Sequence, residues 1–397
     1  MKASLKTFKS GKGDCIFFLI DDDGKRFVTM IDCGKYTPEI KKYVEERLGK
    51  HINILIVTHI DNDHLDGIVE MLEQTPDIKI GKILYNCNQL WNGTTNKQAS
   101  ESLQQDLLVL RGNLPSRQTI DNGKIRAEKA ITLAEILGQK EEWWNAWKKD
   151  EYITTETPPI ALDEEDDKFG VFTVISPKIT DIEKLNTLYR VEYSRLTKHI
   201  LDEGGHLEGQ EALFEMVERL TTMKRENFKK LDSVKTGVTS ITFDEKFLTE
   251  AYKFEPQGVT DENGASIAVI WQYGDKRVLF LGDADPDNLV EQINGDEELE
   301  FEAIKVSHHG SKHSTSQQLL HRVNSRHYFF TGGNLKDKPS LEAIIKIVGK
   351  GDNLRRVLHF NNTENIIVKS LFSKQGAIVR EKYNFEVSEI NEHQFEY

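Results

Sequence analysis

Apolar runs separated by polar turns alternate along the chain with stretches of helical spacing. Residues 13–20, 27–34 and 52–57 are short runs rich in β-branched and aromatic residues, which predicts three strands. Residues 38–48 place their apolar side chains on one face of a helix. Strands interleaved with helices are typical of an α/β fold.

The same pattern returns in the second half of the chain. Residues 266–273 and 277–282 are apolar segments separated by Gly274-Asp275, which predicts a hairpin. Residues 339–348 have helical spacing. Four further segments are predicted strands: 169–177, 327–331, 356–360 and 365–372.

Two blocks lack the strand pattern and are predicted to be helical insertions, 92–168 and 178–260. The first contains Trp143, Trp144 and Trp147, which favour packing between helices over stacking on nucleic-acid bases. The predicted organisation is therefore a divided sandwich with inserted segments. Its parts are 1–91, 92–168, 169–177, 178–260 and 261–397.

Two histidines and three carboxylates lie within residues 59–66, directly after the predicted strand 52–57. Carboxylates at this density repel one another unless a cation neutralises them. His59, Asp61, Asp63 and His64 have the spacing H-x-D-x-D-H, and a mixed set of imidazole and carboxylate ligands suits zinc or manganese. The spacing does not fit a calcium loop. A capped polar loop before a helix is the alternative without metal.

Three further motifs accompany this cluster. Asp32 closes a strand in an Asp-x-Gly motif, Asp283 follows the strand 277–282, and His308-His309 follow another apolar segment. In chain order the four motifs are Asp32, the cluster 59–64, Asp283 and His308-His309. Together they resemble the motifs of the metallo-β-lactamase superfamily. The H-x-D-x-D-H variant is similar to the corresponding domain of bacterial DNA-uptake channel proteins and to stand-alone relatives found among antiphage genes. The resemblance implies an α/β fold, the αββα metallo-β-lactamase sandwich, here with helical insertions.

The resemblance also implies a site for two divalent ions. His59 and Asp61 would bind one ion, Asp63 and His64 the second, and Asp283 would bridge them. A histidine of the pair at 308 and 309 would complete the site.

Neighbouring residues at a strand end point to opposite faces, so we expect only one histidine of this pair to reach the ions. His308 is favoured as the ligand and His309 as a proton donor or phosphate contact, with His313 as the second choice of proton donor. Asp63 and Asp283 are expected to position the nucleophile. Asp32 and Lys312 are expected to support the site.

The chain departs from the family pattern in two places. Residues 83–91 contain none of the histidines that many members have there, and Asp61 replaces a histidine. A carboxylate makes the first site harder, which favours manganese or magnesium over zinc there. Lys338-Pro339 stands where the related group has His-Pro, and Lys338 is either a phosphate contact or, as we favour, a lysine that faces solvent.

Composition adds the expected location and partners. The 397 residues contain three scattered cysteines and show neither a leader nor a membrane span, so we expect a cytoplasmic protein with no membrane partner. The formal net charge of −13 opposes nonspecific binding to nucleic acid, although bound ions would make the site itself positive. Nucleic acid or a nucleotide, and a protein partner on the helical insertions, are the expected partners.

The leading functional hypothesis is a metal-dependent phosphodiesterase or nuclease in which two ions activate a water. One alternative is a non-catalytic or partner-activated component of a bacterial defence complex, stabilised by metal. A second is a hydrolase of a small ester unrelated to nucleic acid. The scaffold also supports iron-based oxidoreductases.

Overall fold

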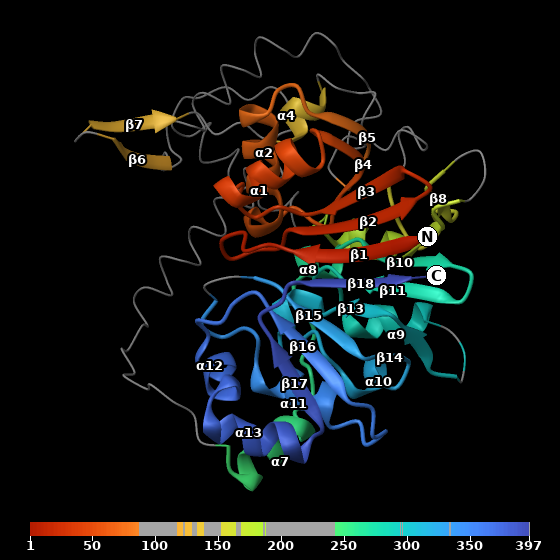
Figure 1. Cartoon of the computed structure of the whole chain (residues 1–397), viewed down its shortest axis with the longest axis vertical. Helices are drawn as coiled ribbons and strands as arrows, with labels where there is room; N and C mark the ends of the chain where they lie inside the picture. The colour runs from red at the N-terminus through yellow and green to blue at the C-terminus, as the bar shows by residue number, and fades with distance from the viewer. Residues whose placement is uncertain are drawn as a thin grey trace.

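Two mixed β-sheets lie face to face, and helices cover the outer face of each (Figure 1). The computed structural model describes residues 1–86, 117–121, 124–128, 133–138, 152–163, 168–185, 187, 243–293, 295, 297–332 and 335–396. The predicted αββα sandwich is confirmed. Within these described residues, no helix is long and apolar enough to cross a membrane.

The first sheet has the strand order β18-β1-β2-β3-β4-β5. Strands β1 to β3 are antiparallel neighbours, and β4 and β5 continue the sheet in parallel with β3. The strands are β1 (Lys2–Thr7), β2 (Ile16–Asp22), β3 (Lys25–Ile31), β4 (His51–Val57), β5 (Lys79–Tyr85) and β18 (Glu392–Glu396). The helices outside them are α1 (Pro38–Lys42), the π-helix η1 (Tyr43–Arg47), α2 (Asn62–Gln74) and α4 (Leu133–Gly138).

The second sheet has the order β17-β16-β15-β13-β11-β10-β9-β8. Its strands are β8 (Ile160–Ala161), β9 (Val171–Ser176), β10 (Ala268–Tyr273), β11 (Lys276–Phe280), β13 (Ala303–Lys305), β15 (His327–Phe330), β16 (Arg356–Phe360) and β17 (Phe385–Ser388). Its helices are α7 (Glu245–Lys253), α9 (Pro286–Gln292), α10 (Gln317–Leu320), α11 (Leu341–Val348), α12 (Ile366–Phe372) and α13 (Lys374–Lys382). The short elements are α8 (Asp261–Gly264), the pair β12 (Leu299–Phe301) and β14 (Val323–Ser325), and the hairpin β6 (Arg117–Asp121) and β7 (Lys124–Glu128).

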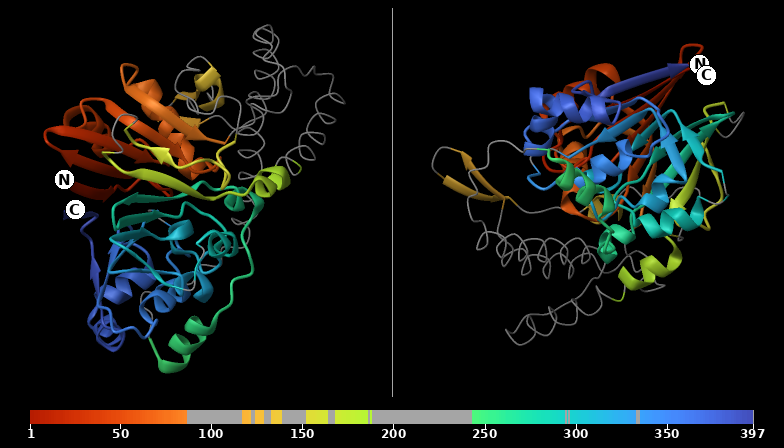
Figure 2. Two further views of the ribbon diagram at one scale, coloured as in Figure 1. Left: turned by 90° about the vertical axis from the view of Figure 1, so that its right-hand side faces the viewer. Right: turned by 90° about the horizontal axis from the view of Figure 1, so that it is seen from below.

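The C-terminal strand β18 pairs with β1, so the end of the chain joins the N-terminal sheet and the two termini lie close together (Figure 2). Because side chains alternate along a strand, each sheet fills two apolar layers. In β4, Ile54 and Ile56 face the other sheet, whereas Leu55 and Val57 face the helices. This double burial explains why residues 54–57 of β4 are all apolar.

Aromatic residues fix the two sheets against each other. The rings of Phe18 in β2 and Trp271 in β10 meet edge to face with their centroids 5.0 Å apart, and the Trp271 indole donates a hydrogen bond to the Phe169 carbonyl (2.8 Å). Buried aromatic side chains contribute large contact areas and specific ring geometry. These contacts therefore join the inner faces of the two sheets.

Most predicted elements are present, but the prediction of a strand at 365–372 is wrong. This segment is helix α12, and the Asn365 side chain accepts hydrogen bonds from the amides of Ile367 and Val368. The N-cap stabilises a helical start, and a short apolar run does not by itself distinguish a buried helix from a strand.

The described parts of the two predicted insertions are not wholly helical. Strands β6 and β7 form an antiparallel pair, and β8 extends the second sheet beside β9. The three tryptophans at 143, 144 and 147 and the segment 209–230 lie outside the described residues, and the proposed domain boundaries remain predictions.

Candidate metal centre

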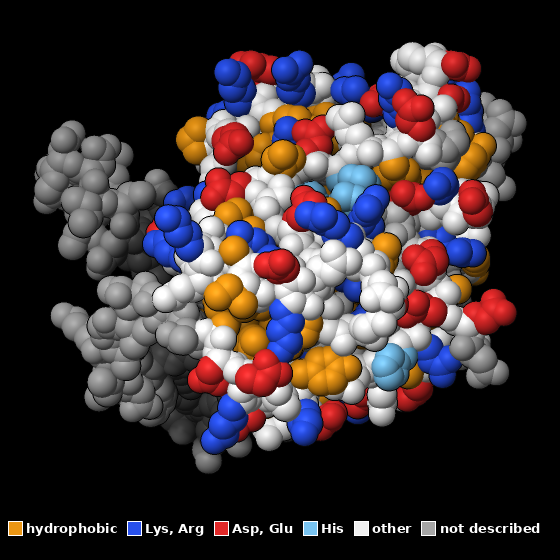
Figure 3. Space-filling model, turned by 60° about the horizontal axis from the view of Figure 1, so that its bottom comes forward, with side chains coloured by type: hydrophobic (Ala, Val, Ile, Leu, Met, Phe, Trp, Pro, Cys, Tyr) orange, Lys and Arg blue, Asp and Glu red, His pale blue; other side chains and the backbone are white. Residues whose placement is uncertain are grey.

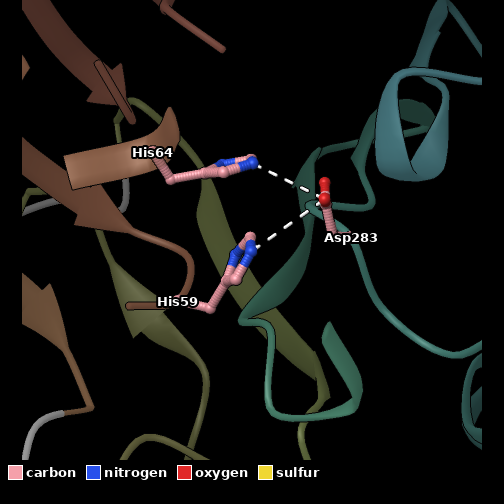
Figure 4. A group of neighbouring side chains, drawn as sticks. All are labelled: His59, His64 and Asp283. Atoms are coloured by element: carbon pink, nitrogen blue, oxygen red, sulfur yellow. Dashed lines mark ion pairs between the residues drawn. The ribbon is translucent and has the colours of Figure 1, made fainter. Parts of the chain in front are cut away.

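The candidate site lies where strand ends of the two sheets meet. His59 and Asp61 connect β4 to α2, and Asp63 and His64 belong to the first turn of α2. Asp283 comes from the other half of the chain, just after β11. Figure 4 shows His59 and His64 extending from the N-terminal half toward Asp283. Each half therefore supplies part of one cluster.

Asp283 is the common neighbour of the histidines. Its Oδ2 lies 3.9 Å from Nε2 of His59, 3.5 Å from His64, 3.5 Å from His308 and 3.8 Å from His309. Zinc ligands lie about 2.0–2.2 Å from the ion, so two ligands of one tetrahedral ion are about 3.4 Å apart. The observed separations are close to that value and at or beyond the limit of a hydrogen bond.

Several nitrogen and oxygen atoms of this cluster that could bind a metal are buried and have no hydrogen-bond partner. Buried polar atoms normally have one. The atoms without a partner are Nε2 of His59, His64 and His309 and Oδ1 of Asp61 and Asp283. Among the described residues, three sets of three bring their potential metal-ligating atoms within 4.8 Å of one another: His59, His64 and Asp283; Asp63, His64 and His309; and Asp14, Asp32 and His64. Imidazole nitrogens and carboxylate oxygens that converge in this way fit a divalent transition-metal ion.

A second layer of polar groups holds His64 and His59 in place. The Nδ1 of His64 lies 2.8 Å from Asp32 Oδ2, and Asp32 also accepts from the Thr58 amide (2.7 Å) and hydroxyl (2.8 Å). His59 Nδ1 lies 3.0 Å from the hydroxyls of Thr58 and Ser266. A carboxylate on Nδ1 fixes the tautomer that leaves Nε2 available to a metal.

His309 has a corresponding carboxylate from the opposite half of the chain. Its Nδ1 lies 2.9 Å from Asp14 Oδ1, and its Nε2 lies 3.5 Å from Asp63 Oδ2. The other oxygen of Asp14 contacts the Lys305 ammonium, which also donates to the Gly282 carbonyl (3.1 Å). Asp14, His309 and Lys305 are all fully buried.

The carboxylates and imidazoles of the cluster shift one another's pKa values. Burial disfavours a charged carboxylate, but the surrounding histidines outweigh it and hold the pKa of Asp283 well below its ordinary value. Burial also disfavours a charged imidazole, yet Asp283 and Asp32 raise the pKa of His64 well above its ordinary value. A site that attracts protons this strongly in the absence of another cation also has the charge to attract a metal ion.

The expectation that His308 and His309 lie at a strand end and point to opposite faces is wrong. His308 and His309 are not at a strand end but in the 3₁₀ turn η3 (Ser307–Gly310), with φ of 50° and 55°. In this left-handed turn both Nε2 atoms come within 4 Å of Asp283. His309 is fully buried on Asp14, whereas the His308 side chain is 19% exposed. The geometry therefore makes His309 the better ligand candidate, and the favoured roles of the two histidines remain untested.

Two other predicted residues lie apart from the cluster. His313 accepts from the Gln257 amide (3.4 Å) and packs against Phe254. Lys312 extends over the same ring, 3.8 Å from Glu342. Neither has a described contact with the metal-binding side chains.

Lys338 does have such a contact. Its ammonium lies against His308 Nε2, so the expectation that it faces solvent is wrong. Burial, together with this neighbouring cation, lowers the pKa of His308 to about 3. A neutral imidazole beside a lysine thus borders the cluster.

Sequence reasoning assigned no role to Asp14, Thr58, Ser266 or Lys305. Two of them carry a recognisable signal in the sequence. Asp14 lies just before the apolar strand β2, and Lys305 ends the buried strand β13. A lysine inside a buried strand is uncommon unless a carboxylate pairs with it.

Comparison with known proteins gives similarity to solved structures only: no family model matches the chain, and no curated protein matches it. One similar structure is a diphosphatase of the PhnP family, with 9% identity, TM-score 0.37, and coverage of 100% of this chain and 98% of that one. Another is Zn²⁺-bound PqqB from Methylobacterium extorquens, with 11% identity, TM-score 0.37 and 100% coverage of both chains. A mutant of the CmlA beta-hydroxylase matches with 8% identity, TM-score 0.35, and coverage of 99% of this chain and 54% of that one. These similarities indicate a fold only, and the residues of the site are what indicate a function.

Proposed function

We propose that this protein is a metal-dependent hydrolase that cleaves phosphodiesters. The observation that carries the proposal is the convergence on Asp283 of three buried imidazole nitrogens, from both halves of the chain, that lack a hydrogen-bond partner: Nε2 of His59, His64 and His309. Leaving such atoms unpaired costs free energy in each case. An apolar or hydrogen-bonded replacement would avoid that cost, so the arrangement favours a binding role.

The proposed ligands fall into two sets that share Asp283. His59 and Asp61 would hold one ion, and Asp63, His64 and His309 would hold the second. When bound, divalent ions lower the pKa of water and stabilise negative charge on phosphoryl oxygens.

Asp63 is the proposed residue that orients the attacking water. Its side chain is 34% exposed, unlike the fully buried His64 and His309, so it borders the side from which water and substrate enter. Burial raises the pKa of a carboxyl, but His309 and His64 outweigh this and hold the pKa of Asp63 low. Asp63 is therefore ionised and would accept a hydrogen bond from that water.

Lys338 supports an anionic substrate. Its ammonium lies beside His308 at the partly exposed edge of the cluster, where it would donate to a phosphoryl oxygen. Asp61 in the ligand set adds the harder character that suits manganese or magnesium as well as zinc. A nuclease is the leading form of this activity, and the setting in bacterial defence implied by the sequence resemblance stays a prediction.

The surface gives less support to nonspecific binding of long nucleic acid. On the face in Figure 3, acidic and basic side chains are interspersed, and neither sign covers it. Since binding along a phosphate backbone depends on many lysine and arginine contacts, we favour recognition close to the scissile phosphate.

The test combines metal analysis with hydrolysis. Purified protein is assayed for bound metal and for cleavage of labelled single- and double-stranded DNA and RNA, and of bis(p-nitrophenyl) phosphate, in Mn²⁺, Zn²⁺ and Mg²⁺. We expect metal-dependent cleavage that Asp63→Ala abolishes and Asp77→Ala retains, because Asp77 is exposed and pairs with Lys50. Bound metal without cleavage of any phosphodiester would overturn the proposed reaction, and absence of bound metal would overturn the metal centre itself.

A further inference from the structure

Lys305 is a fully buried lysine that connects the two halves of the candidate metal centre. It ends β13 in the second sheet, and its ammonium contacts Asp14, which lies just before β2 of the first sheet. It donates to the Gly282 carbonyl (3.1 Å) and lies 3.9 Å from Asp283 Oδ1. One ammonium thus touches both the carboxylate that orients His309 and the chain segment that carries Asp283.

This position matters because each set of proposed ligands draws on both sheets. His59, Asp61, Asp63 and His64 follow β4 of the first sheet, whereas Asp283 and His309 follow β11 and β13 of the second. Asp14 belongs to the first half but orients His309 of the second half (2.9 Å). Without a cation on its other oxygen, Asp14 would be a buried carboxylate free to turn away from the His309 ring.

We propose that Lys305 is a positioning residue of the metal centre, which holds Asp14 on His309 and thereby aligns His309 with the ligands of the first sheet. The inference rests on the proposed metal centre and adds the residue that aligns it. Lys305 itself would not contact the ion or substrate. It acts through Asp14, and so through the direction of the His309 Nε2 lone pair.

A second buried lysine provides a matched control. Lys346 in α11 is also almost completely buried, at 1% exposure, but its ammonium donates to the Thr315 carbonyl (2.9 Å) and lies over the Phe254 ring. It has no described contact with Asp14, Asp283 or the histidines. Lys305→Met and Lys346→Met therefore remove equivalent charges from equally buried places, and only the first is expected to disturb the metal centre.

The experiment measures metal binding rather than turnover. The Kd for Zn²⁺ is determined by competition with a chelator for the full-length wild type, Lys305→Met and Lys346→Met, and the absorption spectrum of the Co²⁺-loaded proteins reports the ligand set. We expect Lys305→Met to weaken binding about 10- to 100-fold, as loss of a group behind the ligands typically does, and to change the Co²⁺ spectrum. Lys346→Met should change neither, whatever its effect on the melting temperature.

The double variant Asp14→Asn/Lys305→Met keeps the test decisive where the single variant fails to fold, because it removes both buried charges together. If Lys305 acts through Asp14, this protein should bind Zn²⁺ no more weakly than Asp14→Asn alone. Additive losses would overturn the inference, as would equal Kd values for wild type and a folded Lys305→Met. Failure of the wild type to bind Zn²⁺, Mn²⁺ or Co²⁺ would instead overturn the proposed metal centre, so the two failures are distinct.

Discussion

The Nδ1 atom of His64 lies 2.8 Å from Oδ2 of Asp32, and both side chains are completely buried. Asp32 adopts a left-handed conformation (φ 57°) after β3, which turns its carboxylate toward α2. The Asp-x-Gly motif therefore contributes to the candidate site by orienting a histidine, and Asp32 lies one layer behind the proposed ligands.

Replacing Asp32 with asparagine tests whether this carboxylate orients His64 for metal binding. Asparagine tolerates a positive φ but has one oxygen fewer to accept from Thr58 and His64, so the His64 ring loses its fixed orientation. We expect Asp32→Asn to weaken metal binding about 10- to 100-fold, measured by competition with a chelator. Asp21→Asn, which alters an exposed ion pair with Arg26, is the control. Equal affinity of folded Asp32→Asn and wild type would show that His64 needs no orienting carboxylate.

Lys338→Met separates substrate recognition from metal binding. A hydrogen bond to a charged group contributes about 1.5–3 kcal/mol, so kcat/KM for a phosphodiester should fall about 10- to 100-fold. The number of bound metal ions should not change. The exposed Lys336 provides the matched variant, Lys336→Met, with wild-type kinetics expected. A proportional loss for an uncharged ester substrate would contradict a role in binding the anionic oxygen.

Features formed by residues near one another in the sequence could be predicted. Contacts between residues that only folding brings together could not. The run 52–57 and the polar cluster after it indicated β4 and a metal site because strand, turn and ligands are contiguous. The contact of Asp14 with His309 joins residues 295 positions apart, so no local pattern reports it. Local backbone conformation set a second limit, since the left-handed turn at His308 and His309 brings together two side chains that strand alternation would separate.

The rings of His327, His359 and His393 stack on one another at β18. From the burial of His359 we expect the protein to lose stability in acid. His359 is 5% exposed, its ring stacks on Phe329 with centroids 4.3 Å apart, and its Nδ1 donates to the Ile390 carbonyl (2.7 Å). Burial, with a smaller contribution from His393, lowers the pKa of His359 to about 4. The folded protein therefore binds a proton at His359 less readily than the unfolded chain. Stability from this histidine is complete above about pH 6.5, the unfolded pKa, and is lost as pH falls toward 4.

Urea unfolding at pH 7 and pH 5, with EDTA present to exclude metal effects, measures this loss. At about 1.4 kcal/mol per pH unit below the unfolded pKa, His359 accounts for up to about 2 kcal/mol over this interval. His359→Gln should reduce the pH dependence by that amount, whereas His321→Gln, at an exposed position, should leave it unchanged. An unaltered pH dependence in His359→Gln would assign the acid sensitivity to other groups.

Gly67 lies in α2, where helix propensity alone would make alanine more stable than glycine. The surroundings of Gly67 predict the opposite effect on stability. A Cβ at this position would lie 2.6 Å from both the Cys33 Sγ and the Lys35 amide nitrogen, and the Gly67 amide donates to the Cys33 carbonyl (2.7 Å). Alanine is normally favoured over glycine in a helix by about 1 kcal/mol, but overpacking of this kind costs about 1–3 kcal/mol.

We therefore expect Gly67→Ala to lower the free energy of unfolding, measured in urea, while Glu73→Ala at an exposed position of the same helix does not. Because the first turn of α2 carries Asp63 and His64, a displaced helix should also weaken metal binding. A stabilised Gly67→Ala protein with unchanged metal affinity would show that the loop after β3 yields to the added methyl group and that the close contact between Gly67 and Cys33 does not fix the position of the ligands.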